Sequence, residues 1–375
     1  MNIKGLRRGV MTVNPYVPGK TIEEVKREKG LKEVIKLGSN ENAYAPFPGA
    51  LEAMQQELTR LNCYPDITFV EIKELLSKRY GLTVQHFAIS HGAEGMLQNI
   101  GKCFIEDGDE VIIPHPTYGL YSEISKLMGA RVIETPLNDK YVIDLEAIKK
   151  ALTPKTKLIW LCNPNNPTGT IFDKNDFNDL LGQLPDNTWI ILDEAYAEFA
   201  ERTKLPEIIE AVQKGKSVIA IRTFSKAFGL AGARIGYAIS SPEMITVIDT
   251  VSEPFNANRV GLAGATATLK KDHEYYQQSL KTILNDRKRV ISELSSLGFE
   301  VIPSETNFVF FSTPYDCQEL ANFLLEYGII VRPCSSWGLP NSIRVTIGTT
   351  DECNKFISTL KHILTKYYES SVVSI

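Results

Sequence analysis

The residues most able to do chemistry lie around a lysine in the stretch Arg222-Thr-Phe-Ser-Lys-Ala-Phe-Gly-Leu-Ala-Gly-Ala-Arg234. Lys226 stands among Ala, Phe, Leu and Gly, and desolvation disfavours the charged form of an amine. A neutral lysine amine is a nucleophile that can form a Schiff base with an aldehyde. Ser225 and Arg234 supply a hydroxyl and a planar guanidinium, which suit a phosphate. The stretch therefore suggests pyridoxal phosphate, and a surface lysine beside a Gly-rich turn is the plainer alternative.

Two further polar motifs directly follow apolar runs. Asp193-Glu-Ala-Tyr196 comes after one run, and Cys162-Asn-Pro-Asn-Asn-Pro-Thr-Gly169 ends another. A carboxylate at a strand end could keep a pyridine nitrogen protonated, which makes such a ring a strong electron sink. Tyr196 and Asn166 could both donate to the phenolic oxygen of the same ring. A helix N-cap aspartate and an ordinary turn are the alternative interpretations.

Weaker signals lie elsewhere in the chain. His91-Gly-Ala-Glu-Gly95 precedes a helical pattern, and small residues there leave backbone N–H groups open to a phosphate. Tyr118 could stack on an aromatic ring or be a core tyrosine. Arg344, in the middle of an apolar run, and Arg332, after another, could each bind a substrate carboxylate or phosphate, or form a structural ion pair.

Length, composition and charge limit the classes of protein to which the chain can belong. The chain has 375 residues, of which 43 % are hydrophobic and 23 % charged, and a net charge of −4. This length fits a large α/β domain plus a smaller one, and the charge provides no basic field for nucleic acid or a membrane. Six scattered cysteines favour reduced thiols in the cytoplasm. The histidines show no metal-ligand spacing, and no apolar run could span a bilayer.

The elements that must position these motifs alternate along the middle of the chain. Alternating strands and helices predict a mainly parallel sheet with helices on both faces, and such sheets bind ligands at the carboxyl ends of their strands. The seven expected strands are Phe87–Ser90, Glu110–Ile113, Arg131–Glu134, Lys157–Cys162, Trp189–Leu192, Val218–Ile221 and Ile235–Ile239. The expected helices are Gly49–Arg60, Val70–Tyr80, Glu94–Phe104, Tyr118–Met128, Leu145–Ala151 and Asn175–Leu184.

The two ends of the chain differ from this middle part. Residues 1–45 are rich in Pro and Asn around one helical pattern, Thr21–Lys29. The pattern His273–Leu297 is long enough to connect two lobes, and short strands with two helices follow it. We expect an N-terminal arm (residues 1–45), a large cofactor-binding domain (46–285) and a small α+β C-terminal domain (286–375). The expected strands and helices of this last part are Glu300–Ile302, Asn307–Phe311, Ile329–Val331, Ser342–Thr346, Cys317–Tyr327 and Asp351–Tyr367.

In their order, the motifs together resemble those of the fold type I pyridoxal-phosphate enzymes, the aspartate aminotransferase superfamily. Within it the chain is similar to the histidinol-phosphate aminotransferase family, over nearly its whole length. The matching stretches are Pro15-Tyr-Val-Pro-Gly-Lys20, Asn40-Glu-Asn42, Tyr64-Pro-Asp66, Pro116-Thr-Tyr118, Asn163-Pro-Asn-Asn-Pro-Thr-Gly169, Asp193-Glu-Ala-Tyr-Ala-Glu-Phe199, Thr223-Phe-Ser-Lys-Ala-Phe228 and Arg344-Val-Thr-Ile-Gly-Thr349.

The resemblance implies a role for each candidate residue. Lys226 would be the Schiff-base lysine and proton shuttle, and Asp193 would pair with the pyridinium nitrogen. Asn166, in a cis peptide with Pro167, and Tyr196 would bind the phenolic oxygen, while Tyr118 would stack on the ring. The phosphate would be held by Ala93 and Glu94 (through backbone amides), Ser225, Arg234 and, from the partner subunit, Tyr64. The anionic end of the substrate would face Tyr16, Arg332 and Arg344.

The implied protein is a homodimeric, cytoplasmic aminotransferase with no metal, whose active site is shared across the subunit interface. Its favoured substrates are histidinol phosphate and 2-oxoglutarate, in L-histidine biosynthesis. Because Arg344 would hold a carboxylate as readily as a phosphate, an aromatic amino acid aminotransferase is the first alternative. A decarboxylase of an O-phospho amino acid is the second. Neither a DNA-binding extension, which a transcription regulator would need, nor the Gly-x-Gly-x-x-Gly of a dehydrogenase is present.

The chain departs from the family pattern in two places. Ala43 and Ala45 stand where Pro and Gly are usual, and His91 and Glu94 stand where Asn and Asp are usual. These departures leave the expected cofactor chemistry intact, but they affect the loop on the substrate side.

Overall fold

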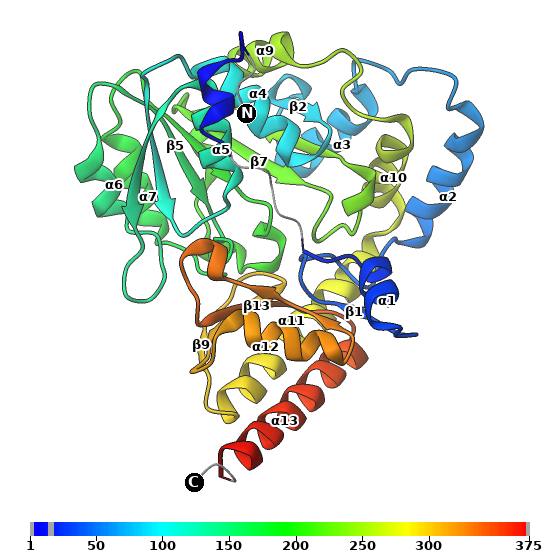
Figure 1. Ribbon diagram of the computed structural model, residues 1–375. Helices are drawn as coiled ribbons and strands as arrows, with labels where there is room; N and C mark the ends of the chain where they lie inside the picture. The colour runs from blue at the N-terminus through cyan, green and yellow to red at the C-terminus, as the bar shows by residue number, and fades with distance from the viewer. Residues whose placement is uncertain (1–3, 14–18, 373–375) are drawn as a thin grey trace.

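The computed structural model describes residues 4–13 and 19–372. It forms two lobes, one built on a seven-stranded sheet and the other on a four-stranded sheet (Figure 1). Within the described ranges, no helix is both long and apolar enough to cross a membrane.

The seven-stranded sheet has the order β2-β8-β7-β6-β5-β3-β4. Neighbouring strands from β7 to β4 pair in parallel, whereas β8 is antiparallel to both β7 and β2. The expected mainly parallel sheet is therefore confirmed. The strands are β2 (Phe87–Ser90), β3 (Glu110–His115), β4 (Arg131–Pro136), β5 (Thr156–Cys162), β6 (Trp189–Asp193), β7 (Val218–Thr223) and β8 (Gly236–Ile239).

The inner strands read as apolar runs because helices cover both faces of the sheet (Figure 1), whereas the edge strand β4 is mostly not buried. Successive side chains of β6 point to opposite faces: Ile190 and Leu192 join one buried cluster, and Ile191 joins the other. The helices of this lobe are α2 (Pro48–Glu57), α3 (Val70–Tyr80), α4 (Gly92–Phe104), α5 (Leu120–Met128), α6 (Leu145–Ala151), α7 (Lys174–Gly182), α8 (Ile208–Gln213), α9 (Pro242–Val251) and α10 (Arg259–Lys271).

Helices α8, α9 and α10 were not expected from the sequence. The case of α10 has a clear physical reason, because glycine weakens a helical pattern and α10 contains Gly261 and Gly264. A Cβ at Gly264 would lie 2.8 Å from the sulfur of Met54 on α2, and one at Gly261 would lie 2.4 Å from the carbonyl oxygen of Ala233. These glycines therefore serve close packing, which local sequence does not reveal.

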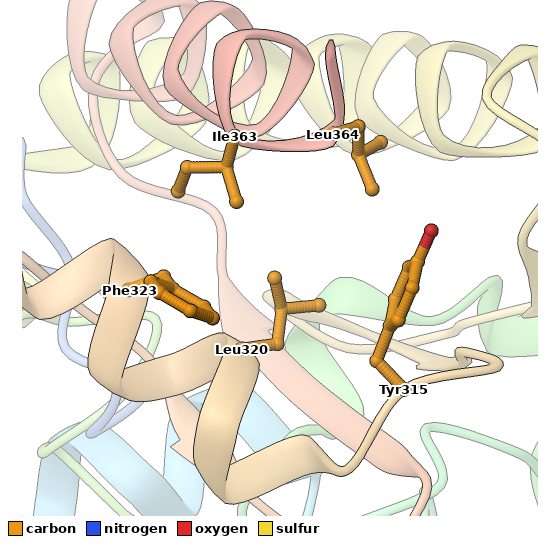
Figure 2. A pocket seen from close by; sticks show the side chains of 5 residues that line it. All are labelled: Tyr315, Leu320, Phe323, Ile363 and Leu364. Atoms are coloured by element: carbon orange, nitrogen blue, oxygen red, sulfur yellow. The ribbon is translucent and has the colours of Figure 1, made fainter. Parts of the chain in front are cut away.

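The smaller lobe is α+β, as expected, with an antiparallel sheet in the order β12-β13-β10-β9. Figure 2 shows apolar side chains facing one another between its helices α12 and α13, including Leu320, Phe323 and Ile363. The elements of this lobe are β9 (Glu300–Ile302), β10 (Phe308–Ser312), α12 (Cys317–Glu326), β11 (Ile329–Ile330), β12 (Arg332–Pro333), β13 (Ser342–Thr346) and α13 (Thr350–Val372).

Two segments connect the lobes. The N-terminal segment contains α1 (Ile22–Lys29), which Thr21 caps, and β1 (Ile35–Lys36), which pairs in parallel with β11 of the smaller lobe. The long helix α11 (His273–Ser296) carries Arg287, whose Nη1 donates to the carbonyls of Phe199 in the larger lobe and Thr306 in the smaller one. The domain boundaries at residues 45 and 285 stay a prediction.

Candidate active site

Lys226 lies in the loop that follows β7, at the carboxyl edge of the large sheet. Its neighbours Phe224 and Ala227 are fully buried, and its Nζ donates to the carbonyl oxygen of Ser39 at 3.1 Å. Burial lowers the pKa of this amine to about 8, and the nearby Arg344 guanidinium acts in the same direction. Near pH 8 a sizeable share of the amine is therefore neutral and nucleophilic.

Asp193 ends β6 next to Cys162 of β5, so both strands deliver their last residues to the same edge. The carboxylate is 4 % exposed, and burial raises its pKa to about 6. Its Oδ2 accepts from the hydroxyl of Tyr121 at 2.8 Å, and its Oδ1 accepts from the backbone N–H of Ala195 at 3.0 Å. Both of these hydrogen-bond donors are neutral, and the charge of Lys226 adds a smaller stabilisation of the ionised form, so a cationic ligand group could still pair with the carboxylate.

Tyr121 is a further candidate for the site, which its hydrogen bond to Asp193 reveals and the sequence did not indicate. It lies on α5, is fully buried, and stacks on Trp160 with ring centroids 5.4 Å apart. The missed signal is the close pair Tyr118 and Tyr121 at the start of α5, where the backbone N–H of Tyr121 donates to the carbonyl oxygen of Tyr118 at 3.4 Å. The two tyrosine rings meet edge to face at 5.6 Å.

Arg344 extends from β13 of the smaller lobe to the loop after β5 of the larger lobe. Its Nη1 donates to Oδ1 of Asn166 at 2.5 Å, and its Nη2 donates to the carbonyl oxygen of Gly38 at 2.7 Å. The Asn166–Pro167 peptide is cis. The structure thus brings together Asn166 and Arg344, which the sequence separates by 178 positions.

Arg332 lies beside Arg344, and Trp337 lies close to both. The guanidinium carbon of Arg332 is 5.5 Å from the Trp337 ring, and that of Arg344 is 5.7 Å from it. The indole N–H of Trp337 donates to the carbonyl oxygen of Thr117 at 2.7 Å, which ties the smaller lobe to the residue before Tyr118. Two cations beside one aromatic wall suit an anionic substrate group.

A cradle for an anion forms where α4 begins. Arg234 directs Nη1 toward Oγ of Ser225 at 3.4 Å, and the first N–H groups of α4 have no acceptor within the helix. Gly92 has a φ of +80°, and a Cβ there would lie 2.6 Å from Nη2 of Arg234. The backbone therefore approaches the guanidinium as closely as only glycine permits.

The side chain of Glu94 lies at this cradle, although the sequence analysis gave it a backbone role only. Its Oε2 pairs with Nη2 of Arg234 at 3.2 Å, and its Oε1 accepts from the hydroxyl of Tyr118 at 2.6 Å. A carboxylate thus already contacts the guanidinium that would bind a phosphate.

Two candidates lie apart from this group. Tyr64 is 75 % exposed and stacks on Phe255, with ring centroids 4.3 Å apart. Its backbone carbonyl accepts from Nη2 of Arg259 at 2.5 Å. Tyr16 lies outside the described residues.

The donor set fits pyridoxal phosphate, the cofactor expected from the resemblance. Lys226 offers an amine of lowered pKa, Asp193 a buried carboxylate without a cation bonded to it, and the start of α4 an anion cradle. In the described part of the chain, no group of three or more His, Cys, Asp or Glu residues could hold a metal ion.

Comparison with known proteins agrees with this arrangement. The family model described as aminotransferase class I and II matches residues 32–360. The histidinol-phosphate aminotransferase of Moorella thermoacetica is 38 % identical over 96 % of this chain and 92 % of its own, and that of Symbiobacterium thermophilum is 35 % identical over 96 % and 99 %. The crystal structure of histidinol-phosphate aminotransferase from Sinorhizobium meliloti in complex with pyridoxal-5'-phosphate superposes with a TM-score of 0.89. It is 29 % identical and covers 98 % of this chain and 99 % of that one. The chain therefore belongs to the class I and II aminotransferases and, among them, to the histidinol-phosphate aminotransferase family.

Proposed function

We propose that this aminotransferase moves the amino group of histidinol phosphate to 2-oxoglutarate, with pyridoxal 5'-phosphate as its cofactor, in the cytoplasm. The observation that carries the proposal is that a half-buried lysine of lowered pKa and a buried aspartate of raised pKa lie at the same edge of the sheet. Full-length relatives named for this reaction supply the substrate.

Each residue has a role that follows from its position. When bound, pyridoxal phosphate supplies an aldehyde that links to amines and a ring that takes up electron density from the reacting carbon. The carboxylate of Asp193 keeps a ring nitrogen protonated. Nζ of Lys226 takes a proton from the carbon that bears the substrate's amino group, because the amine is partly neutral near pH 8.

The other candidate residues would hold the rest of the cofactor. Asn166 and Tyr196 would bind the phenolic oxygen, and Tyr118 would stack on the ring. The phosphate is held by Ser225 and Arg234 together with backbone amides of the first turn of α4, at Ala93 and Glu94.

The anionic ends of both substrates are recognised by Arg332 and Arg344, with Tyr16 as a further contact. The guanidinium of Arg344 donates hydrogen bonds to Asn166 and Gly38, so its orientation is fixed before a substrate binds. A planar fork of this kind binds a carboxylate or a phosphate with two hydrogen bonds.

The proposed protein is a homodimer in which Tyr64 reaches the phosphate of the partner subunit. Support comes from a run of exposed large apolar side chains between α2 and the start of α3, which includes Leu58, Leu61, Ile67 and Val70 beside Tyr64. Exposed large apolar side chains so close together in the sequence support an interface with another subunit.

A hybrid-dimer experiment tests this arrangement. Tyr64→Ala and Lys226→Ala homodimers should each be nearly inactive, and mixing them with subunit exchange should restore about a quarter of the wild-type sites, because half of the statistical dimers carry one intact site. No recovery in a mixture whose subunits demonstrably exchange would place Tyr64 in its own subunit's site or outside any site.

The substrate is tested by a half-reaction without a keto acid. Protein loaded with pyridoxal phosphate is mixed with histidinol phosphate or with phenylalanine, and the visible band is followed. Fast bleaching by histidinol phosphate and slow bleaching by phenylalanine is the expected result. Bleaching by phenylalanine alone would make the enzyme an aromatic aminotransferase, and bleaching by neither would refute both assignments.

A further inference from the structure

We propose that Asn40 is a positioning residue that fixes the direction of the Tyr196 hydroxyl proton and so lowers the pKa of the bound cofactor. The inference rests on the proposed function, because it takes the phenolic oxygen of pyridoxal phosphate to be the group that faces Tyr196. It assigns a specific task to a residue that the sequence analysis treated only as part of a matching loop.

Asn40 is buried, at 1 % exposure, and it joins the two lobes. Its side-chain Nδ2 donates to the hydroxyl of Tyr196 at 2.9 Å, and its backbone carbonyl oxygen accepts from Nδ2 of Asn307 at 3.0 Å. Its backbone N–H donates to Oγ1 of Thr346 at 2.9 Å. Each polar group of Asn40 thus has a partner on an element that lines the site.

The orientation of the Asn40 amide follows from these partners. Oγ1 of Thr346 accepts from the Asn40 backbone, and its own proton points to Oδ1 of Asn40 at 3.1 Å. The carbonyl end of the amide therefore faces Thr346, and the NH₂ end faces Tyr196. A chain of donors runs from Thr346 through Asn40 to the tyrosine oxygen.

This chain determines what the Tyr196 hydroxyl can do. A hydroxyl has one proton, and the oxygen of Tyr196 already accepts from Asn40. Its proton must therefore point to another acceptor. The other ionisable groups around it are Arg344, Cys162, Asp193 and Lys226. Each oxygen of Asp193 already accepts one hydrogen bond, from Tyr121 and from Ala195, and we take a phenolic oxygen of the cofactor to be the acceptor of the Tyr196 proton.

The neighbours of Asn40 along the chain strengthen the argument. The carbonyl of Gly38 accepts from Arg344, and that of Ser39 accepts from Nζ of Lys226. Three consecutive residues thus each contact a different proposed active-site side chain. A displacement of the backbone at Asn40 would move the contacts of Arg344, Lys226 and Tyr196 together. Variants must therefore change the direction of the Tyr196 proton without displacing the backbone.

The backbone of Asn40 makes that separation feasible. Its φ is 56°, in the left-handed region that Asn, Asp and Gly tolerate. Asn40→Asp therefore keeps shape and backbone but replaces the donor with an acceptor, which takes the tyrosine proton. Asn40→Gly keeps the backbone and removes the side chain, which leaves the tyrosine free to donate to the cofactor.

The experiment is a pH titration of the visible absorbance of bound pyridoxal phosphate. Relative to the wild type, Asn40→Asp should raise the cofactor pKa by about one to two pH units, since losing a hydrogen bond to the charged form shifts a pKa by that much. Asn40→Gly should raise it by less. The effect on stability should be the reverse: Asn40→Gly, which loses every side-chain hydrogen bond, should have a lower melting temperature than Asn40→Asp.

A second background separates the tyrosine from the added charge. In Tyr196→Phe protein, Asn40→Asp should shift the cofactor pKa by much less than in the wild-type background, because no hydroxyl proton remains to be turned. Equal shifts in both backgrounds, or a larger shift for Asn40→Gly than for Asn40→Asp, would overturn the inference. Wild-type protein without a visible band would instead refute the proposed function, so the two failures are distinguishable.

Discussion

Replacing Asp193 by asparagine should make the cofactor-free protein more stable while it disables the enzyme. The carboxylate is 4 % exposed, with only neutral donors bonded to it, from Tyr121 and the backbone of Ala195. Burial raises its pKa from 3.8 to about 6. A carboxyl group whose pKa is raised on folding favours the folded state only while it is protonated, so this contribution is lost as the pH rises through about 6.

The magnitude follows from the two pKa values. The interval from 3.8 to about 6 is about two pH units, which corresponds to about 3 kcal/mol of destabilisation once the group is ionised in both states. Asparagine has the same shape and does not ionise, and the Tyr121 hydroxyl can turn to accept from its NH₂ group. At pH 8 cofactor-free Asp193→Asn protein should therefore be more stable by about 3 kcal/mol, at pH 5 by about 1.5 kcal/mol, and at pH 4 by only about 0.5 kcal/mol.

Urea unfolding of cofactor-free protein at these three pH values measures the differences. Asp139→Asn is a matched control, because Asp139 is exposed in a turn and its replacement should change stability by less than about 0.5 kcal/mol at every pH. Adding pyridoxal phosphate should reverse the order, since only the aspartate can pair with a ring cation. A variant that is no more stable than the wild type at pH 8, or whose gain is independent of pH, would refute the reasoning.

Three further predictions concern the same edge of the sheet. Tyr121→Phe removes the donor that stabilises the ionised Asp193, so it should lower kcat while cofactor-free stability at pH 8 falls by about 1.5 kcal/mol or more; unchanged kcat would contradict the role given to Tyr121. Glu94→Gln frees Arg234 from a half-exposed ion pair, so absorbance titration of cofactor-free protein should give a Kd for pyridoxal phosphate lower by up to about fivefold; weaker binding would show that the carboxylate does not compete with the phosphate. Gly92→Ala places a Cβ 2.6 Å from Nη2 of Arg234 at a φ of +80°, so the same titration should show weaker binding by at least about tenfold.

The inner strands of the large sheet could be predicted because helices bury both of their faces. Each buried strand then reads as an apolar run that ends at a polar motif, and β2 (Phe87–Ser90) has the bounds expected from its run. Parallel strands end at one edge of a sheet, so the sequence predicted Asp193 and Asn166 at the same edge. In the structure, β5 and β6 do end side by side, at Cys162 and Asp193. Helix α10 was missed because its glycines serve contacts with α2 and Ala233 that are remote in sequence.

Candidate site residues could be predicted where a residue's own position in the sequence indicates its role. They could not be predicted where the role depends on a contact with a residue far away in the sequence. Asp193 and Lys226 are recognisable from strand ends and apolar neighbours, whereas the hydroxyl of Tyr121 reaches Asp193 from a helix 72 positions away. The position of the Glu94 carboxylate against Arg234 depends on a side-chain direction that a loop motif does not encode. The role of Asn40 depends on three partners at long sequence separation, so no local pattern could indicate it.

The burial that tunes Lys226 and Asp193 also leaves the cofactor-free site in a costly state. Desolvation lowers the pKa of the amine to about 8 and raises that of the carboxyl to about 6, so near neutral pH each group is charged in surroundings that disfavour its charge. Pyridoxal phosphate offers a ring cation to one and a covalent partner to the other, and relief of both costs adds to its affinity. The site should therefore bind the cofactor tightly. In the cofactor-free protein, removing either charge should increase the free energy of unfolding. A substitution at Asp193 that stabilises the cofactor-free protein should therefore also inactivate the enzyme.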